Sequence, residues 1–410
     1  MSCLVFKFGG TSVATIERVL HVAKRIQKEK EKGYDIVVVV SAMGKTTDKL
    51  VEMAHEIMPN PSKREMDTLL TTGEQVTISL LSMALQSLGL SAQSFTGWQA
   101  GILTEGIPSD SRIVEIQSEN VRKALDKGQV AVVAGFQGVD SNNNITTLGR
   151  GGSDTTAVAL AAALGAERCD IYTDVDGVYT SDPRYVPKAR KLQELSYDEM
   201  LELANLGAGV LHPRAVEFAK NYNIPLAVRS SYVEDEGTIM KEEVEVEKDL
   251  VVRGVAFMSD IVRVTVGYEG NYKGSLVNIF TVLADNHINV DIIVQTILEG
   301  VEPSVSFTIT KENLADTVRV LEANKSKIGY CHVNYEEDVA KVSIVGSGMV
   351  SNPGVAAKMF DRLHKENITL KMVSTSEIKI SVVIPQESML LTANALHDEF
   401  ELAASLAIQV

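Results

Sequence analysis

The stretch DIVVVV, residues 35–40, constrains the fold of this chain more than any other. An unbroken run of β-branched apolar residues suits a strand that is buried on both faces. QVAVVAGFQG (residues 129–138) and CDIYTDVDGVY (residues 169–179) have the same character, and SDTTAVALAAALGAE (residues 153–167) between them predicts a buried helix. This alternation favours a parallel or mostly parallel sheet with helices on both faces, which binds ligands at the carboxyl ends of its strands.

A helix is also predicted between the first two strands, over VATIERVLHVAKRIQKEKEK. Thr11 and Ser12 before it are residues that favour helix N-caps, and Gly33 after it favours a helix end. The first 230 residues therefore follow a strand–helix alternation throughout.

Length and composition exclude several classes of protein. A chain of 410 residues with 45% hydrophobic and 23% charged residues is expected to form two or three globular domains. No apolar run reaches about 18 residues and no signal peptide is evident, so we expect neither a membrane span nor export, but a cytoplasmic protein. Three widely separated cysteines predict neither a disulfide framework nor a zinc site. A net charge of −15 argues against nucleic acid and anionic membranes as partners.

The second half contains a repeat. An offset of 80 residues aligns Gly274 with Gly354 and Phe280 with Phe360, and each copy reads as βαββαβ, the ferredoxin-like unit. The segment EDEGTIMKEEVEVEKD, which starts at Glu234, holds eight acidic residues against two lysines and reads as a connector. The expected organisation is a strand–helix domain over residues 1–233, an acidic connector over 234–259 with the capacity to add a strand to the repeat region, and repeat copies over 260–336 and 337–410.

The segment VFKFGGTSV, residues 5–13, is typical of a strand, a glycine turn and a helix start. Gly9 and Gly10 allow the backbone to approach an anion, and the helix N-terminus adds N–H groups and partial positive charge. Lys7 lies in a strand among valine and phenylalanines, where a surface lysine is not expected. We interpret it as a cation directed at that anion, although the spacing is not that of a P-loop.

Three further segments place polar residues at predicted strand ends or helix starts. TLGRGGSDTTA holds Arg150 in a glycine loop, which suits bidentate capture of a carboxylate or phosphate, while Asp154 also reads as an ordinary N-cap. In TTGEQ, Glu74 is either a ligand for an ammonium group or a carboxylate favoured by the helix dipole alone. YTDVDGVYTSDPR offers Tyr179 to an adenine, and its aspartates are also common turn formers.

No G-x-S-x-G or H-E-x-x-H motif occurs, and the seven histidines show no ligand spacing. His212 in LHPR is interpreted as structural. The means of catalysis that remain are positioning of the reactants and electrostatic stabilisation of moving negative charge. Those are the requirements of phosphoryl transfer.

The segments KFGGTS, VVVVSAMGKTTD, TTGEQ, FTGWQAGI, AGFQG, TTLGRGGSDTTA, YTDVDGVYTSDPR and RSS together closely resemble the aspartate kinases of the amino acid kinase family. The second half resembles the tandem ACT domains of those enzymes. The resemblance covers essentially the whole chain, and KFGGTS with GRGGSD separates aspartate kinases from acetylglutamate, carbamate and uridylate kinases. It implies an αβα sandwich of the carbamate kinase-like type followed by two ferredoxin-like ACT domains.

The resemblance implies an ATP:L-aspartate 4-phosphotransferase that uses ATP and Mg²⁺, with the metal carried by ATP and not by protein ligands. It implies catalytic roles for Lys7, which contacts the transferring phosphoryl group, and for Asp154, which organises that lysine. The implied ATP-binding residues are Lys7, Phe8, Gly9, Gly10, Thr11, Ser12, Thr173, Asp174, Tyr179, Asp182 and Arg184. The implied aspartate-binding residues are Ser41, Thr47, Glu74 for the ammonium group, Arg150 for the α-carboxylate, Gly151, Gly152 and Ser153.

The sequence departs from the family at one place, since GAGVLHP puts Gly209 where many members carry a lysine that reaches ATP. Arg184 and Arg214 are the candidates for that charge. The ACT domains imply feedback inhibition of this first step of lysine, threonine and methionine biosynthesis, by lysine alone or together with threonine, and a homo-oligomer formed through them. The candidate effector residues are Gly274, Asn289, Asp291, Gln295, Thr369 and Leu370, which also read as polar strand ends without a ligand.

Two other functions remain open from the sequence. One is a kinase of the same fold with another acceptor, such as acetylglutamate, whose acylated amine has no charge for Glu74 to bind. The other is an amino-acid sensor without catalysis, against which the presence of Lys7, Arg150 and Asp154 argues.

Overall fold

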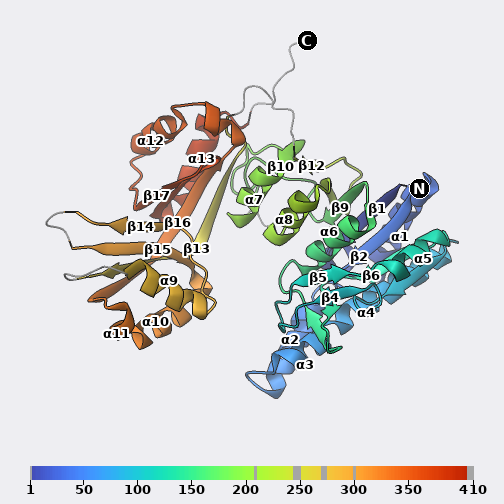
Figure 1. Ribbon diagram of the computed structural model, residues 1–410. Helices are drawn as coiled ribbons and strands as arrows, with labels where there is room; N and C mark the ends of the chain where they lie inside the picture. The colour runs from blue at the N-terminus through green and yellow to red at the C-terminus, as the bar shows by residue number, and fades with distance from the viewer. Residues whose placement is uncertain (1, 207–209, 243–250, 269–274, 299–301, 404–410) are drawn as a thin grey trace, which may run out of the picture. The chain divides into compact units, whose positions relative to one another are not determined.

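The computed structural model describes residues 2–206, 210–242, 251–268, 275–298 and 302–403 (Figure 1). The chain divides into two compact units. The first contains the described residues of 1–178, 191–205 and 209–246, and the second contains those of 179–190, 206–208 and 247–410. Residues 179–190 thus lie in the first half of the sequence but belong to the second unit.

The first unit is built on an eight-stranded sheet with the order β10-β12-β11-β9-β1-β2-β6-β3. Its strands are β1 Cys3–Phe8, β2 Asp35–Val40, β3 Ala92–Phe95, β6 Val130–Ala134, β9 Arg168–Thr173, β10 Glu194–Ser196, β11 Leu226–Ser230 and β12 Thr238–Lys241. All neighbours in this sheet pair in parallel except β11 and β12. The predicted mostly parallel sheet is confirmed, and the acidic segment after Glu234 supplies its strand β12.

Helices cover both faces of this sheet. The helices of the unit are α1 Ile16–Glu31, α2 Thr46–Ile57, α3 Lys63–Leu70, α4 Thr72–Ser87, α5 Glu119–Asp126, α6 Gly152–Leu164, α7 Tyr197–Asn205 and α8 Pro213–Tyr222, with a 3₁₀ turn η1 over Gly10–Val13. Side chains of α1 and α4 share a core with alternate residues of β1, β2 and β6, such as Phe6 and Val38. Helix α6 packs against β1, β2, β9 and α8. Because Lys7 alternates with Phe6 and Phe8, its side chain is on the face opposite to theirs.

A second, four-stranded sheet in this unit has the order β5-β4-β7-β8. Its strands are β4 Ile102–Thr104, β5 Ile113–Ile116, β7 Gln137–Val139 and β8 Ile145–Thr147. The loop that follows β8 leads directly into α6.

One sequence expectation for the first unit is wrong. Thr11 and Ser12 do not cap α1, because residues Gly10–Val13 form the separate turn η1. Thr15 is the N-cap, and its hydroxyl accepts a hydrogen bond from the backbone N–H of Arg18 at 3.3 Å. The helix ends at Glu31, close to the predicted stop at Gly33, which has a φ of +96°.

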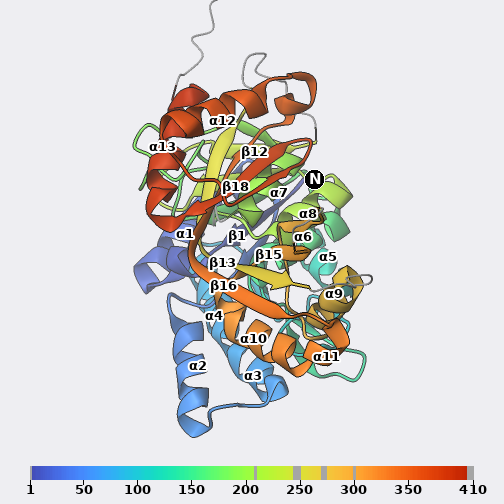
Figure 2. The same cartoon turned by 90° about the vertical axis from the view of Figure 1, so that its left-hand side faces the viewer.

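The second unit is built on a six-stranded antiparallel sheet with the order β14-β15-β13-β16-β18-β17. Figure 2 labels four of these strands, β13, β15, β16 and β18. Its strands are β13 Gly254–Gly267, β14 Ile293–Thr296, β15 Ser304–Thr310, β16 His332–Val345, β17 Met372–Thr375 and β18 Lys379–Pro385. Its helices are α9 Ser275–Asp285, α10 Leu314–Ala323, α11 Lys325–Ile328, α12 Val355–Lys365 and α13 Met389–Glu399, with 3₁₀ turns η2 Lys311–Asn313, η3 Ser347–Ser351 and η4 Gln386–Ser388.

The long strands β13 and β16 are shared by the two repeat copies. Residues 261–267 of β13 pair with β15 in the first copy, whereas 254–258 pair with 341–345 of β16. The same end of β16 pairs with β18 in the second copy. The first copy therefore runs β13-α9-β14-β15-α10-β16, as predicted, and the second begins in β16 and is completed by the start of β13.

Each copy has its own core on the helix side of the sheet. Val264, Ile279 and Phe307 belong to the core of the first copy, and Val342, Met359 and Val382 to that of the second. Val186, from the segment 179–190, is also part of the second core. The backbone N–H of Val255 donates to the carbonyl of Thr180 at 2.8 Å, which explains why that segment belongs to this unit.

Candidate active site

Polar side chains of the first unit gather at the carboxyl ends of β1, β2, β6 and β9. Strand β1 lies between β2 and β9, where the chain changes from building one half of the sheet to building the other. In parallel sheets this reversal of strand order is where ligands bind. The loops that follow these strands carry the residues selected from the sequence.

Lys7 lies near the end of the central strand, opposite Val39 of β2 and Ile171 of β9. Its Nζ is 2.6 Å from Oδ1 of Asp154, in the first turn of α6, and both side chains are only 12% exposed. Asp154 does not cap this helix through its side chain, since the N-cap is Gly151. The carboxylate instead holds the lysine at the end of β1.

The glycine loop after β1 packs tightly against the loop after β2. A Cβ on Gly10 would stand 2.8 Å from the carbonyl oxygen of Ala42, closer than real Cβ contacts, and the carbonyl of Gly10 accepts from the N–H of Gly44 at 3.0 Å. Gly9 donates to the carbonyl of Tyr172 at 3.3 Å. The turn is thus fixed on both sides, with Thr11 exposed and Ser12 buried behind it.

Glu74 is a buried carboxylate in the first turn of α4, and its side chain is directed at the same loop. Its Oε1 accepts from the backbone N–H of Ala42 at 3.0 Å, whereas Oε2 has no hydrogen-bond partner among the described residues. Burial raises the pKa of Glu74 to about 7, and its hydrogen bonds to the backbone only partly oppose this. A buried carboxylate with a spare acceptor is suited to a cationic ligand. Ser41 and Thr47, from the same loop and the start of α2, are half-buried.

Arg150 lies in the loop between β8 and α6, flanked by Gly149 (φ +72°) and Gly151 (φ +68°). Its side chain is exposed and has no ion pair or hydrogen bond within the described part of the chain. The ring of His212 lies against Gly151, where any Cβ would collide with it, so His212 has a structural role in shaping the loop. Burial lowers the pKa of His212.

Gly152 and Ser153 begin α6 beside the end of β6. A Cβ on Gly135, just after β6, would be 2.8 Å from the Cβ of Ser153, so the first turn of α6 lies directly against the strand end. Ser153 is buried, as is Asp154 in the same turn.

The predicted nucleotide residues are divided between the two units. Thr173 is the last residue of β9 in the first unit and Asp174 follows it, and the hydroxyl of Thr173 donates to Asp174 at 3.2 Å. Tyr179, Asp182 and Arg184 belong to the second unit. There the Arg184 guanidinium pairs with Asp182 at 2.6 Å and lowers the pKa of that carboxyl.

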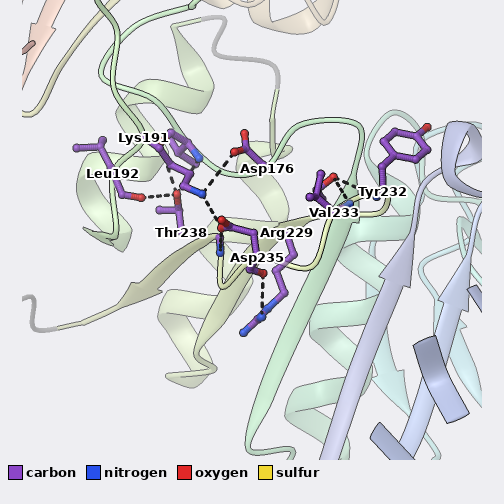
Figure 3. Close-up of polar contacts among 11 residues, drawn as sticks. Asp176, Lys191, Leu192, Arg229, Tyr232, Val233, Asp235 and Thr238 are labelled. Carbon is purple, nitrogen blue, oxygen red and sulfur yellow. Dashed lines mark hydrogen bonds and ion pairs between the residues drawn. The ribbon is translucent and has the colours of Figure 1, made fainter. Parts of the chain in front are cut away.

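Figure 3 shows how the loops after β9 and β11 are tied together. Nζ of Lys191 lies 2.5 Å from Asp235 and 3.4 Å from Asp176, and Arg229 donates to the carbonyl of Asp235 at 3.3 Å. Partial burial lowers the pKa of Lys191, but the hydrogen bond to Asp235 and the charge of Asp176 outweigh it and raise the pKa overall. The hydroxyl of Thr238 accepts from the N–H of Val178 at 2.8 Å and donates to the carbonyl of Leu192 at 2.6 Å, so further polar contacts hold the loop after β9.

Gly209 stands where many family members carry a lysine, and Arg214 is one of the candidates to supply that charge. Arg214 is bonded to the carbonyls of Leu148 at 2.8 Å and Ser111 at 3.2 Å and to Asp110 at 3.1 Å, so its guanidinium is engaged within the protein. Gly209 lies outside the described residues, as does the candidate effector residue Gly274.

The other candidate effector residues lie in the second unit and are exposed: Asn289, Asp291, Gln295, Thr369 and Leu370. The carboxylate of Asp291 forms an ion pair with Lys341 of β16, a lysine that is itself only 5% exposed. This partner was not anticipated from the sequence, because the two residues are 50 positions apart.

Sequence reasoning also missed Asp67 of α3, which is fully buried. Its one signal was an acidic residue within the apolar helical pattern of EMDTLL, seven positions before Glu74. Among the described residues, no group of three or more His, Cys, Asp or Glu is placed to hold a metal ion. No helix in the described ranges is long and apolar enough to cross a membrane.

The sequence and the fold both match known proteins. The model of the amino acid kinase family matches residues 2–230, and an ACT domain model matches residues 342–400. The chain therefore belongs to the amino acid kinase family.

Relatives that match this chain over nearly its full length are aspartokinases. An aspartokinase of Bacillus sp. (strain MGA3) is 61% identical over 405 residues, which cover 99% of this chain and 98% of the relative. Two crystal structures of E. coli aspartokinase III are 27% identical and cover 97% of this chain and 99% of theirs. The R-state complex with aspartate and ADP gives a TM-score of 0.83, and the T-state complex with lysine and aspartate gives 0.76. The chain is an aspartate kinase.

Proposed function

We propose that the protein transfers the γ-phosphoryl group of MgATP to the β-carboxylate of L-aspartate and so forms 4-phospho-L-aspartate. The observation that carries this proposal is the buried Glu74 carboxylate, whose Oε2 has no partner among the described residues. Among candidate acceptors, aspartate has an ammonium group to fill that position, whereas acetylglutamate does not.

The proposed binding of aspartate uses two charged side chains. Glu74 accepts the ammonium group and Arg150, which has no partner of its own in the described chain, takes the α-carboxylate. Ser41, Thr47 and the residues Gly151–Ser153 complete the pocket. The β-carboxylate is then the nucleophile, and an ionised carboxylate requires no general base.

Lys7 is the proposed electrostatic catalyst. Its ammonium group neutralises charge on the phosphoryl group as that group passes from ATP to aspartate, and Asp154 at 2.6 Å fixes its position. Gly9, Gly10 and the turn η1, together with Thr173 and Asp174, are proposed to contact the nucleotide. Magnesium is proposed to be bound through the phosphates of ATP.

The proposed regulation acts through the ACT domains. E. coli aspartokinase III has been crystallised with lysine, and this supports lysine as an inhibitor of the present chain. Inhibition by lysine together with threonine is the proposed alternative. Asn289, Asp291, Gln295, Thr369 and Leu370 remain the proposed effector residues, and a homo-oligomer through the ACT domains is the proposed assembly. The proposed place of action is the cytoplasm, where ATP and aspartate are available.

A coupled assay of ADP formation with aspartate, acetylglutamate and other acids tests the substrate. ADP formation with aspartate is expected. If aspartate gives no ADP while another of the acids does, the proposal is refuted. Repeating the initial rates with lysine, threonine and both identifies the inhibitor. Light scattering after size exclusion gives the oligomeric state.

The Lys7→Ala variant tests the proposed catalyst. Loss of a positioned cation at the transition state is expected to lower kcat by at least about 100-fold. Calorimetric titration with the inhibitor serves as the control and should give the wild-type affinity. Near-normal turnover by the variant would contradict the role of Lys7.

A further inference from the structure

Asp67 of α3 is a fully buried carboxylate that takes part in no step described above. Its Oδ2 accepts from the backbone N–H groups of Ser109 at 3.0 Å and Thr147 at 3.1 Å. Its Oδ1 accepts from the hydroxyls of the same two residues, at 3.2 and 2.8 Å. A buried charge is tolerated when it is satisfied in this way, and hydrogen bonds to a charged acceptor are the stronger kind.

These bonds hold the start of the loop that carries Arg150. Thr147 is the last residue of β8, three positions before Arg150. Its carbonyl accepts from the N–H of Ser111 at 2.9 Å, and the next carbonyl, that of Leu148, is held by Arg214. Since the guanidinium of Arg150 has no partner in the described chain, its position depends on this anchored loop.

Asp67 is also connected to Glu74 through the short segment of chain between them. Thr71 ends α3 and precedes α4 in a helical conformation (φ −62°, ψ −17°), so the two helices continue one another closely. The N–H of Thr71 donates to the carbonyl of Asp67 at 3.2 Å, and the carbonyl of Thr71 accepts from the side chain of Gln137 at 3.1 Å. One short segment therefore carries Glu74 at one end and, at the other, Asp67, which is hydrogen-bonded to the start of the Arg150 loop.

We propose that Asp67 is a positioning residue that sets the separation between Glu74 and Arg150. It thereby selects acceptors in which an ammonium group and a carboxylate are attached to the same carbon. The inference rests on the proposed function, in which these two side chains bind those two groups. Asp67 itself touches no substrate and acts through the Arg150 loop.

The Asp67→Asn variant is the first test. The amide places an NH₂ group, which cannot accept a hydrogen bond, where a carboxylate oxygen now accepts from two donors. The loop should therefore lose part of its anchor. The KM for aspartate is expected to rise by about tenfold or more, the KM for ATP by less than about twofold. The preference for aspartate over its α-amide should fall, because the α-carboxylate is then poorly recognised.

Asp140→Asn is the matched control. Asp140 is also a nearly buried carboxylate of the small sheet, 9% exposed at the turn between β7 and β8. It accepts from the N–H groups of Asn142 and Asn144 at 2.9 and 2.8 Å and from the side chain of Asn144 at 3.0 Å. It loses a comparable set of bonds away from Arg150, so the KM for aspartate should remain within about twofold of wild type.

Thr147→Val guards against a failure of Asp67→Asn to fold. It removes only the hydroxyl bonded to Asp67 at 2.8 Å and keeps the backbone bond. A smaller rise in the KM for aspartate is expected, again without a change for ATP. A melting curve shows that each variant is folded at the assay temperature.

The Arg150→Ala background decides whether Asp67 acts through Arg150. In that background Asp67→Asn should raise the KM for aspartate by less than about twofold. An equal rise in both backgrounds, an equal rise for ATP, or wild-type values in both Asp67→Asn and Thr147→Val would overturn the inference.

If the wild-type protein uses aspartate but Arg150→Ala keeps its KM, the role of Arg150 is wrong and the inference falls with it. If the wild-type protein does not use aspartate, the proposed function itself fails.

Discussion

At the scale of single residues, Glu74 makes the proposed aspartate site sensitive to pH. Burial raises its pKa to about 7, so in the free enzyme the carboxyl becomes protonated as the pH falls below that value. A neutral carboxyl no longer attracts an ammonium group, whereas the charges of aspartate itself do not change between about pH 5 and 8. The KM for aspartate is therefore expected to rise about tenfold per unit of pH below about 6.5, as measured by initial rates.

Glu74→Gln is the control for this prediction. The amide does not titrate, so its KM for aspartate should be high and independent of pH. A wild-type KM that stays constant from pH 5 to 8 would show that Glu74 is ionised throughout and that its burial has no effect on binding.

A second residue-scale prediction concerns Lys341, which pairs with Asp291. An effector that presents an ammonium group to Asp291 has to displace this internal cation. In Lys341→Met the competitor is absent, so the half-inhibitory concentration of lysine should fall by about tenfold, with unchanged turnover in its absence.

Lys365→Met is the matched control, because Lys365 pairs instead with Asp361 within helix α12. It should keep the wild-type inhibition curve. An unchanged or higher half-inhibitory concentration in Lys341→Met would contradict the competition between Lys341 and the effector.

Among the elements, the start of α4 and the loop after β2 approach as closely as their side chains permit. A Cβ on Gly73 would be 2.7 Å from the Cβ of Ala42 and 3.6 Å from Thr46. Gly73→Ala should therefore separate the helix from the loop and weaken the bond from Ala42 to Glu74. The expected result is a rise of about tenfold in the KM for aspartate and a loss of about 1–3 kcal/mol of stability, measured by denaturation.

The double variant Gly73→Ala with Ala42→Gly tests the steric cause. Removing the opposing methyl group should restore most of the affinity and stability, although the second substitution itself adds some freedom to the unfolded chain. If the second change makes no improvement, the contact between these two residues is not what limits the site.

At the level of elements the sequence predicted the strands well and the helix boundaries less well. DIVVVV could be recognised as a strand because an unbroken run of β-branched apolar residues fits burial on both faces of a sheet. The start of α1 was predicted at Thr11 and Ser12 because both are good capping residues, yet the chain first makes the turn η1, and Thr15 caps the helix. Capping preference identifies residue types but not which of several neighbouring candidates has the extended backbone that a cap requires.

The candidate site was predictable only in part for a related reason. Lys7, Glu74 and Arg150 were visible because each is a charge in an unexpected local context. The pairing of Lys7 with Asp154 was implied by the family resemblance alone, and the four bonds of Asp67 depend on contacts between distant segments that the residues of one sequence do not reveal. Their roles in binding and catalysis remain predictions.

For the molecule as a whole, the shared strands β13 and β16 make the two repeat copies depend on each other for folding. A fragment of residues 337–410 lacks Gly254–Met258, the partner of its strand β16, and would expose an unpaired edge. It is expected to show no cooperative melting by circular dichroism. A fragment of residues 251–410 should melt in one transition, at a lower temperature than the intact chain because it lacks Val186.

Cooperative melting of residues 337–410 alone would contradict this dependence. A variant of the longer fragment with Val255→Pro provides a matched control, because proline is poorly tolerated inside a paired strand and should weaken the second copy without deleting any residue.

Sharing two strands also affects how this chain can change by inheritance. Repeats usually multiply or disappear by unequal recombination, one copy at a time. Deletion of 80 residues between the equivalent positions Val262 and Val342 would join the first half of β13 to the last residues of β16. The neighbouring strands β13 and β16 would become one strand, and the surviving copy would have lost the pairing between them. Loss of one copy by such a deletion would therefore disrupt the sheet, and we expect the two copies to diverge in sequence more readily than one of them is lost.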